Sequence, residues 1–199
     1  MQAKTLPRAF YLPPPERVAQ RLLGKLLIRR LPGVTLTGRI VEVEAYIGSQ
    51  DAASHAFPGK TARNAVLFGP PGYAYVYFIY GMYYCLNVSC EPEGQAGGVL
   101  FRALEPLSGM AEMARLRGLP PSAKPQLLTS GPGRLCQAFG IGRSEQNGVD
   151  LTRPASELRI ADDGFTPAEI LATPRIGIQK AADLPLRFLI AGNPFVSKG

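Results

Sequence analysis

The sequence predicts an α+β fold with a mainly antiparallel sheet, and three observations support this class. The chain has 199 residues, of which 46% are hydrophobic and 19% charged, as expected for one folded domain with its own core. Its 22 glycines and 19 prolines favour short elements joined by many loops over a helical bundle. The expected strands follow one another as neighbours, without the strand–helix alternation that is typical of a parallel sheet.

The helices and strands are expected in this order along the chain. A first helix covers residues 14–30, where apolar residues recur at helical spacing behind two prolines. A second helix covers residues 107–118, and a third lies within residues 130–142, which open with cap and turn residues. The expected strands cover residues 36–47, 73–90 with a turn near Gly81, and 97–105.

The charge of the chain favours a polyanionic partner. There are 22 Lys and Arg against 15 Asp and Glu, which gives a net charge of +7. The positive charge is concentrated in residues 1–40, whereas residues 41–110 are acidic on balance. A basic chain with an acidic middle is typical of a nucleic-acid-binding protein whose reactive site is not itself a basic trough.

Several classes of protein are disfavoured. We find no apolar segment long enough to span a membrane and no signal peptide, so no membrane partner is expected. The three cysteines lack the spacing of zinc ligands, and we expect reduced thiols in a cytoplasmic protein. The single histidine cannot build a metal site alone, and neither a metal nor an organic cofactor is expected.

The segment Ile40–Ile47 has the alternation of a half-buried strand. One face carries apolar residues, and the other carries Glu42, Glu44 and Tyr46. Paired carboxylates are the usual groups for hydrolysis of a glycosidic bond, because one can activate water and both can stabilise an oxocarbenium-like centre. The alternative interpretation is an ordinary strand with two solvated glutamates.

The segment 73–90 contains six of the eight tyrosines and no charged side chain. Its turn would place Tyr80, Met82 and Tyr83 at the tip, where large apolar groups are costly unless they contact something. Such side chains can wedge between stacked bases, and tyrosines on the strands could stack on a flipped base. A buried core hairpin and a membrane-docking hairpin are the alternatives, although the lack of adjacent Lys and Arg disfavours the second.

Three further residues could belong to the same site. His55 follows the Glu/Tyr strand in a loop, and Arg102 lies in an otherwise apolar strand, where it needs Glu44 or Glu42 as a partner. Arg134 lies in the run SGPGR at the start of a helix, where free N–H groups attract phosphate. The plain alternative for that run is a serine cap followed by a first-turn proline.

Taken in order, these runs resemble one known family. The matching runs are RIVEVEAYIG, DAASH, TARN, YVYFIYGMYYCLNVS, LFRALEPL and TSGPGRLCQAFGI. They resemble the alkyladenine (3-methyladenine) DNA glycosylases of the human-enzyme type, and LPLRFLIAGNPFVS extends the resemblance over nearly the whole chain.

The resemblance implies a single DNA glycosylase domain over residues 1–199, with a curved sheet, surrounding helices and a protruding β-hairpin. The implied activity is base-excision repair without a cofactor. The enzyme flips a purine lesion of the 3-methyladenine, 7-methylguanine, hypoxanthine or ethenoadenine class out of duplex DNA and hydrolyses its N-glycosidic bond. The product is an abasic site. A cytoplasmic monomer is expected, associated with the nucleoid if the source is bacterial.

The resemblance also implies roles for the residues of the reactive centre. Glu44 activates the water, and Arg102 helps to hold Glu44 and that water. The flipped base lies between Tyr46 and His55 on one side and Tyr77 on the other.

Further roles concern recognition of the lesion and of DNA. Asn87 matches the position that clashes with the 2-amino group of normal guanine. Tyr80 fills the gap in the duplex with Met82 beside it. Arg63 lies near the DNA backbone, and Arg134 is a weaker backbone candidate that we add from the residues alone.

Two other functions remain open from the residues. One is a non-catalytic protein that binds damaged or bent DNA, and the other is a hydrolase of free nucleosides. The basic charge and the aromatic tip favour DNA over free nucleosides, and the retained Glu44 with Arg102 favours catalysis over binding alone.

Overall fold

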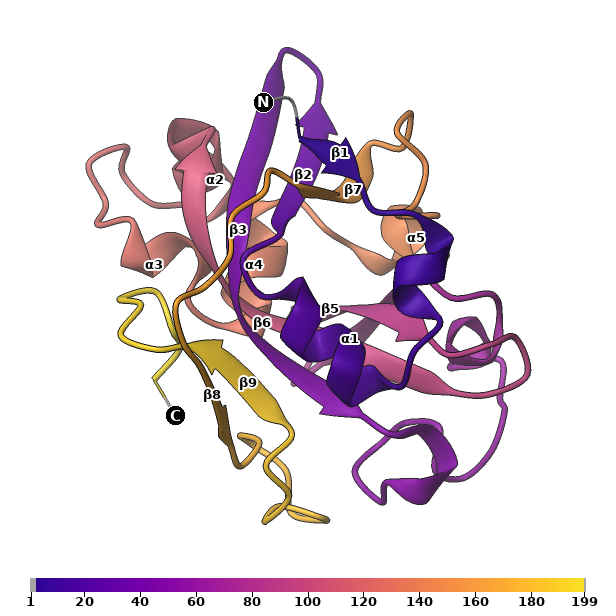
Figure 1. The fold of residues 1–199 in the computed structure, drawn as a ribbon. Helices are drawn as coiled ribbons and strands as arrows, with labels where there is room; N and C mark the ends of the chain where they lie inside the picture. The colour runs from indigo at the N-terminus through magenta and orange to yellow at the C-terminus, as the bar shows by residue number, and fades with distance from the viewer. Residues whose placement is uncertain (1–2, 199) are drawn as a thin grey trace.

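The computed structural model describes residues 3–198, and its strands form one curled antiparallel sheet (Figure 1). The sheet order is β1-β7-β2-β3-β6-β5-β4, and β9 adds to β3 and carries β8. The strands are β1 (Lys4–Thr5), β2 (Leu26–Leu31), β3 (Val34–Tyr46), β4 (Ala74–Ile79), β5 (Tyr83–Cys90), β6 (Gly97–Ser108), β7 (Leu158–Asp162), β8 (Ile170–Thr173) and β9 (Arg187–Ile190). The predicted α+β class is therefore confirmed.

Short helices surround the sheet. They are α1 (Pro15–Leu22), α2 (Met110–Leu116), α3 (Gln126–Thr129), α4 (Pro132–Ala138) and α5 (Arg143–Gln146), with 3-10 turns η1 (Arg8–Tyr11), η2 (Gly48–Gln50) and η3 (Ala65–Phe68). Helix α1 packs on β3 and β6, and α4 packs on β5 and β6. The predicted helices at 107–118 and within 130–142 are confirmed as α2 and α4. Among residues 3–198, no helix has both the length and the apolar character needed to cross a membrane.

The predicted helix over residues 14–30 is wrong in its second half. Helix α1 stops at Leu22, and Gly24 takes a left-handed φ of +85° that continues no α-helix. The run Leu26–Leu31 becomes β2, which pairs with both β3 and β7. The apolar spacing fits either element, and the long-range ladder decides between them.

Strand β3 changes one of its partners midway. Its first half, up to Arg39, pairs with β2, whereas Glu42–Glu44 pairs with β9. Strand β6 pairs with β3 from Thr37 to Tyr46, with irregularities at which Val41 and Arg102 have no partner in the ladder. The sheet therefore branches and kinks at the two glutamates, and a bulge of this kind is a common way to redirect side chains.

The predicted alternation of this strand is confirmed. Val41, Val43 and Ala45 are buried in the main core, and Ile47 packs against it. Glu42 and Glu44 are buried as well, among charged and polar partners rather than in the apolar core.

Candidate active site

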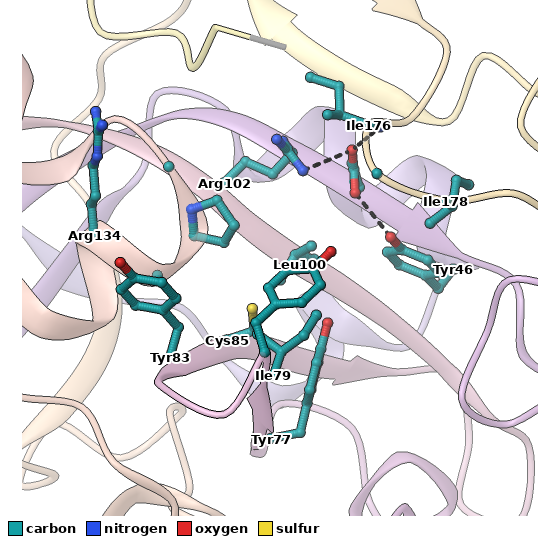
Figure 2. A pocket seen from close by; sticks show the side chains of 16 residues that line it. Tyr46, Tyr77, Ile79, Tyr83, Cys85, Leu100, Arg102, Arg134, Ile176 and Ile178 are labelled. Carbon is teal, nitrogen blue, oxygen red and sulfur yellow. Dashed lines mark hydrogen bonds and ion pairs between the residues drawn. The ribbon is translucent and has the colours of Figure 1, made fainter.

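A cavity of about 340 Å³ opens where β3, β4, β5 and β6 meet the start of α4 and the loop 176–178. Figure 2 shows Tyr46, Tyr77 and Arg102 pointing toward it from three different strands. A smaller chamber of about 130 Å³ shares Tyr46 and Tyr77 with the cavity. After the roles that the sequence predicts for their residues, we name the larger hollow the catalytic chamber and the smaller one the base chamber. The larger volume is within the range of small-molecule sites.

The structure gathers most of the predicted site residues around these chambers. The catalytic chamber is bordered by Glu44, Tyr46, Tyr77, Tyr80, Arg102 and Arg134. The base chamber is bordered by Tyr46, His55, Tyr77 and Asn87. Met82 and Arg63 border neither chamber.

The Glu44 carboxylate is fixed by three donors at the wall of the catalytic chamber. Its Oε1 accepts a hydrogen bond of 2.8 Å from the Ile176 backbone N–H and lies 3.2 Å from Nη1 of Arg102. Its Oε2 accepts a hydrogen bond of 2.9 Å from the Tyr46 hydroxyl. Burial, and then the charge of Glu44, raise the pKa of Tyr46, so this phenol remains a donor. The carboxylate therefore borders the cavity in one fixed orientation.

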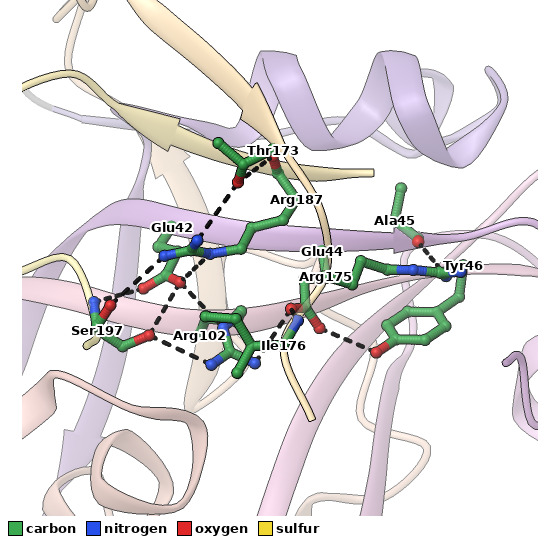
Figure 3. Close-up of polar contacts among 10 residues, drawn as sticks. All are labelled: Glu42, Glu44, Ala45, Tyr46, Arg102, Thr173, Arg175, Ile176, Arg187 and Ser197. Atoms are coloured by element: carbon green, nitrogen blue, oxygen red, sulfur yellow. Dashed lines mark hydrogen bonds and ion pairs between the residues drawn. The ribbon is translucent and has the colours of Figure 1, made fainter. Parts of the chain in front are cut away.

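Glu42 has a different environment, although the alternation places it on the same face (Figure 3). It borders neither chamber. Its carboxylate accepts hydrogen bonds from Arg102 Nε at 3.0 Å, Arg187 Nε at 2.7 Å, and the Ser197 N–H and Oγ at 2.6 and 2.9 Å. Arg102 thus bridges both carboxylates, and the predicted need for Glu44 or Glu42 as its partner is confirmed for both.

The base chamber is walled by aromatic rings. The rings of His55 and Tyr77 are in edge-to-face contact, with centroids 4.4 Å apart. A base does not fit between them, so the expectation that they lie on opposite sides of a base is wrong. They form one wall, and Tyr46 belongs to another strand that borders the same chamber.

Hydrogen bonds hold this wall and the floor below it. His55 Nδ1 lies 3.0 Å from the Tyr75 hydroxyl, and Asn64 Nδ2 donates to the His55 carbonyl oxygen at 2.8 Å. Burial, and then the charge of Arg63, lower the pKa of His55 below 6.5, so its imidazole is neutral at pH 7. Asn87 Nδ2 donates to the Tyr75 carbonyl oxygen at 3.2 Å. The chamber is therefore preformed and carries no net charge on its aromatic wall.

The β4–β5 hairpin ends in the predicted turn at Gly81. Tyr80 takes a left-handed φ of 54° and Gly81 one of 68°, and the Met82 N–H donates to the Ile79 carbonyl oxygen at 3.3 Å. Tyr80 is 77% exposed and Met82 62% exposed. A bulky residue in the left-handed region costs about 1 kcal/mol or more. The strain and exposure at this tip argue for a contact with another molecule.

Comparison with known proteins gives a consistent result. A family model described as methylpurine-DNA glycosylase matches residues 9–194. The chain belongs to the methylpurine-DNA glycosylase family. A relative from Koribacter versatilis is 61% identical over 98% of this chain and 94% of its own length. Relatives from Burkholderia cenocepacia and Methanocella arvoryzae are 49% and 48% identical over 96% and 97% of this chain and 90% and 96% of their own lengths. All three carry the provisional name 3-methyladenine DNA glycosylase.

The protein is accordingly a monofunctional DNA glycosylase, a hydrolase that acts on DNA. The two residues that the sequence analysis places near the DNA backbone lie on the surface of this methylpurine-DNA glycosylase. Arg134 is exposed at the rim of the catalytic chamber, at the start of α4. Arg63 is exposed beside His55 and borders a separate hollow of about 330 Å³.

Sequence reasoning missed several residues that build the site of this glycosylase. Ile176 supplies a backbone donor, Arg187 and Ser197 complete the shell of Glu42, and Arg175 pairs with Asp51 behind Tyr46. Arg187 had a readable signal, since it interrupts an apolar strand as Arg102 does. Within residues 3–198, no three His, Cys, Asp or Glu side chains lie close enough to hold a metal ion.

Proposed function

We propose that this DNA glycosylase turns a damaged purine out of the duplex and hydrolyses its N-glycosidic bond with water that Glu44 activates. The substrate class is alkylated or deaminated purines: 3-methyladenine, 7-methylguanine, hypoxanthine and ethenoadenine. The observation that carries the proposal is the Glu44 carboxylate, held by three donors at the wall of a chamber that continues into an aromatic one.

The chemistry assigned to Glu44 has two parts. As the bond between C1′ and the purine nitrogen breaks, the electron pair leaves with the base, and positive charge develops on the sugar. The anionic carboxylate stabilises that charge and takes a proton from the attacking water, whose oxygen bonds to C1′. Arg102 holds Glu44 through an ion pair of 3.2 Å and is itself oriented by Glu42. A base that is already cationic, such as 3-methyladenine, leaves as a neutral molecule without a donated proton.

The aromatic walls suit such a base. Tyr46 on one side and the contacting pair of His55 and Tyr77 on the other present electron-rich faces, and these attract a cationic purine more strongly than a neutral one. Because the pKa of Tyr77 is raised by burial and that of His55 is lowered by burial, this wall stays uncharged at pH 7 and does not repel a cation. Asn87 at the border of this chamber disfavours the 2-amino group of unmodified guanine.

Extrusion of the base is assigned to the hairpin tip. Tyr80 enters the stack as the wedge, and Met82 lies beside it at the same exposed turn. Arg63 and Arg134, both exposed near the chambers, contact phosphates. None of the residues that line either chamber is a lysine, which agrees with hydrolysis by water rather than attack by an amine.

The test compares the wild-type protein with Glu44→Gln on duplexes that carry one lesion. Wild type is expected to leave alkali-labile abasic sites, and Glu44→Gln is expected to lose nearly all cleavage while it still binds the duplex. Equal cleavage by both proteins would remove Glu44 from its role. Binding without cleavage by wild type would favour a non-catalytic damaged-DNA-binding protein, and cleavage of free nucleosides alone would favour a nucleoside hydrolase.

A further inference from the structure

One segment that borders both chambers lies outside regular secondary structure, so no hydrogen bonds of a sheet or helix fix its position. The segment Arg175–Ile178, called here the wall segment, lies outside every strand and helix. Its residues 176–178 border the catalytic chamber, and Ile178 also borders the base chamber. The Ile176 N–H donates to Glu44 Oε1 at 2.8 Å. The orientation of Glu44 therefore depends on a segment whose own position must be set by side chains.

A buried ion pair between Arg175 and Asp51 anchors this segment. Figure 3 shows the Arg175 side chain beside Tyr46, with its hydrogen bond to the Ala45 carbonyl oxygen. Arg175 Nη2 donates to Asp51 Oδ1 at 2.9 Å and to the Ala181 carbonyl oxygen at 3.2 Å, and Nη1 donates to the Ala45 carbonyl oxygen at 3.0 Å. Asp51 also accepts from the Ile47 N–H at 3.2 Å. One guanidinium thus joins the wall segment to the end of β3 and to the loop that follows it.

The same guanidinium also contacts the aromatic wall. Its carbon atom lies 4.7 Å from the centroid of the Tyr46 ring, and the Tyr46 hydroxyl in turn donates to Glu44 Oε2. Arg175 therefore reaches both oxygens of Glu44 through intermediates: through the Ile176 N–H to Oε1, and through Tyr46 to Oε2. Neither Arg175 nor Asp51 borders a chamber, so neither can touch the substrate there.

Stability alone does not explain this arrangement. Both side chains of the pair are almost completely buried, and a buried ion pair is often replaceable by apolar residues without loss of stability. Burial acts to raise the pKa of Asp51, but the hydrogen bonds from Arg175 and the Ala53 N–H outweigh it and the pKa is lowered. The pair remains ionised and directional, as a positioning device requires.

We propose that Asp51 and Arg175 are positioning residues for the glycosylase reaction, holding the wall segment and Tyr46 where both point their donors at Glu44. The inference rests on the proposed role of Glu44. It predicts that loosening the pair slows excision of a bound lesion more than it weakens binding of the lesion-containing duplex.

A second ion pair, between Arg39 on β3 and Asp163, offers a control for the pair of Arg175 and Asp51. Arg39 makes two hydrogen bonds to Asp163 at 3.1 and 2.8 Å and donates to the Gly24 carbonyl oxygen at 2.7 Å. Its guanidinium lies 4.1 Å from the centroid of the Phe165 ring. Each of the two arginines therefore contacts a carboxylate, a backbone oxygen and an aromatic ring. The ring that Arg175 contacts borders both chambers, whereas Arg39, Asp163 and Phe165 border neither.

The experiment compares Asp51→Asn with Asp163→Asn, alongside wild type and Glu44→Gln. Single-turnover excision from an ethenoadenine duplex gives the rate constant at saturation, and titration of the duplex gives its Kd. Asp51→Asn is expected to lower the rate constant about 10- to 100-fold with Kd within about 3-fold, as for displacement of a reacting group by about 1 Å. Asp163→Asn is expected to keep the wild-type rate constant within about 2-fold.

A second measurement separates positioning from folding. The amide proton of Ile176, which is bonded to a carboxylate, is expected to shift in the NMR spectrum of Asp51→Asn but not in that of Asp163→Asn. If Asp51→Asn does not fold, Arg175→Lys replaces it in both measurements. Lysine keeps the positive charge but cannot form the same set of hydrogen bonds as the guanidinium group. A wild-type rate constant in the folded variant, equal losses in both Asp→Asn variants, or failure of both replacements to fold would overturn the proposal. Excision by Glu44→Gln at the wild-type rate would instead overturn the proposed function.

Discussion

Replacing Glu42 by glutamine is expected to destabilise the fold, whereas the same change at Glu44, two residues away, is expected to remove activity and leave the fold in place. The Glu42 carboxylate is fully buried and accepts four hydrogen bonds, two of them from Arg102 and Arg187. A glutamine keeps the volume but removes the charge and turns an NH2 group toward these donors. The two guanidinium groups then lose their shared anion.

The loss of these ion pairs sets the expected destabilisation of Glu42→Gln. Removing one partner of a buried ion pair costs about 3–5 kcal/mol. For a domain of this size that corresponds to a fall in Tm of about 6–20 °C. At position 44 the glutamine oxygen can still accept from the Ile176 N–H, and its NH2 group can donate to the Tyr46 oxygen. Arg102 loses the negative charge of Glu44 but keeps that of Glu42, so the expected cost of Glu44→Gln, about 1–3 kcal/mol, is smaller than that of Glu42→Gln.

Urea unfolding and thermal unfolding of both variants give the two free energies, and excision of ethenoadenine from a duplex gives the activity of each at a temperature where both are folded. The reasoning would be refuted if the free energy of unfolding of Glu42→Gln lay within about 1 kcal/mol of the wild-type value, because removing one partner of a buried ion pair costs more than that. It would equally fail if Glu44→Gln were the more destabilised of the two.

Three further predictions concern single groups of the site. Tyr46→Phe removes a hydrogen bond of 2.9 Å to a charged acceptor, a loss of about 1.5–3 kcal/mol. It is expected to slow single-turnover excision about 10- to 100-fold and to lower Tm by about 3–12 °C. The pKa of His55 in the folded protein lies below 6.5, so on acidification the unfolded chain binds the proton first. The contribution of His55 to stability is therefore full above pH 6.5 and falls as the pH drops through and below that value. The loss of Tm between pH 7.5 and 5.5 is expected to be smaller in His55→Asn than in wild type. Tyr80→Ala is expected to weaken extrusion of ethenoadenine, read from its fluorescence, without lowering Tm, because the side chain is 77% exposed.

The local part of the site could be predicted from the sequence because it follows from alternation along strands. The period of two fixes the common face of Glu42, Glu44 and Tyr46 wherever the opposite face is buried. The glycine at the centre of an aromatic run likewise marks the hairpin turn at Gly81. These signals need no knowledge of distant residues.

The remaining parts depend on contacts that no local pattern encodes. Whether Leu26–Leu31 continues a helix or forms a strand is decided by pairing with β3 and β7, and its apolar spacing suits both. The different roles of the two glutamates are set by Arg187, Ser197 and Ile176, which lie more than 130 positions further along the chain. The contact between the rings of His55 and Tyr77 is set by a loop whose course the sequence does not reveal.

The long span of the Glu42 network has a consequence for synthesis in the cell. Arg187 and Ser197 reach Glu42 across 145 and 155 positions, so the last contacts around Arg102 close one of the longest loops in the molecule. A nascent chain that has emerged only as far as β7 already carries the hairpin with Tyr80, yet Glu44 still lacks the Ile176 N–H as a donor. In newly made protein the hairpin tip therefore precedes the complete set of donors around Glu44.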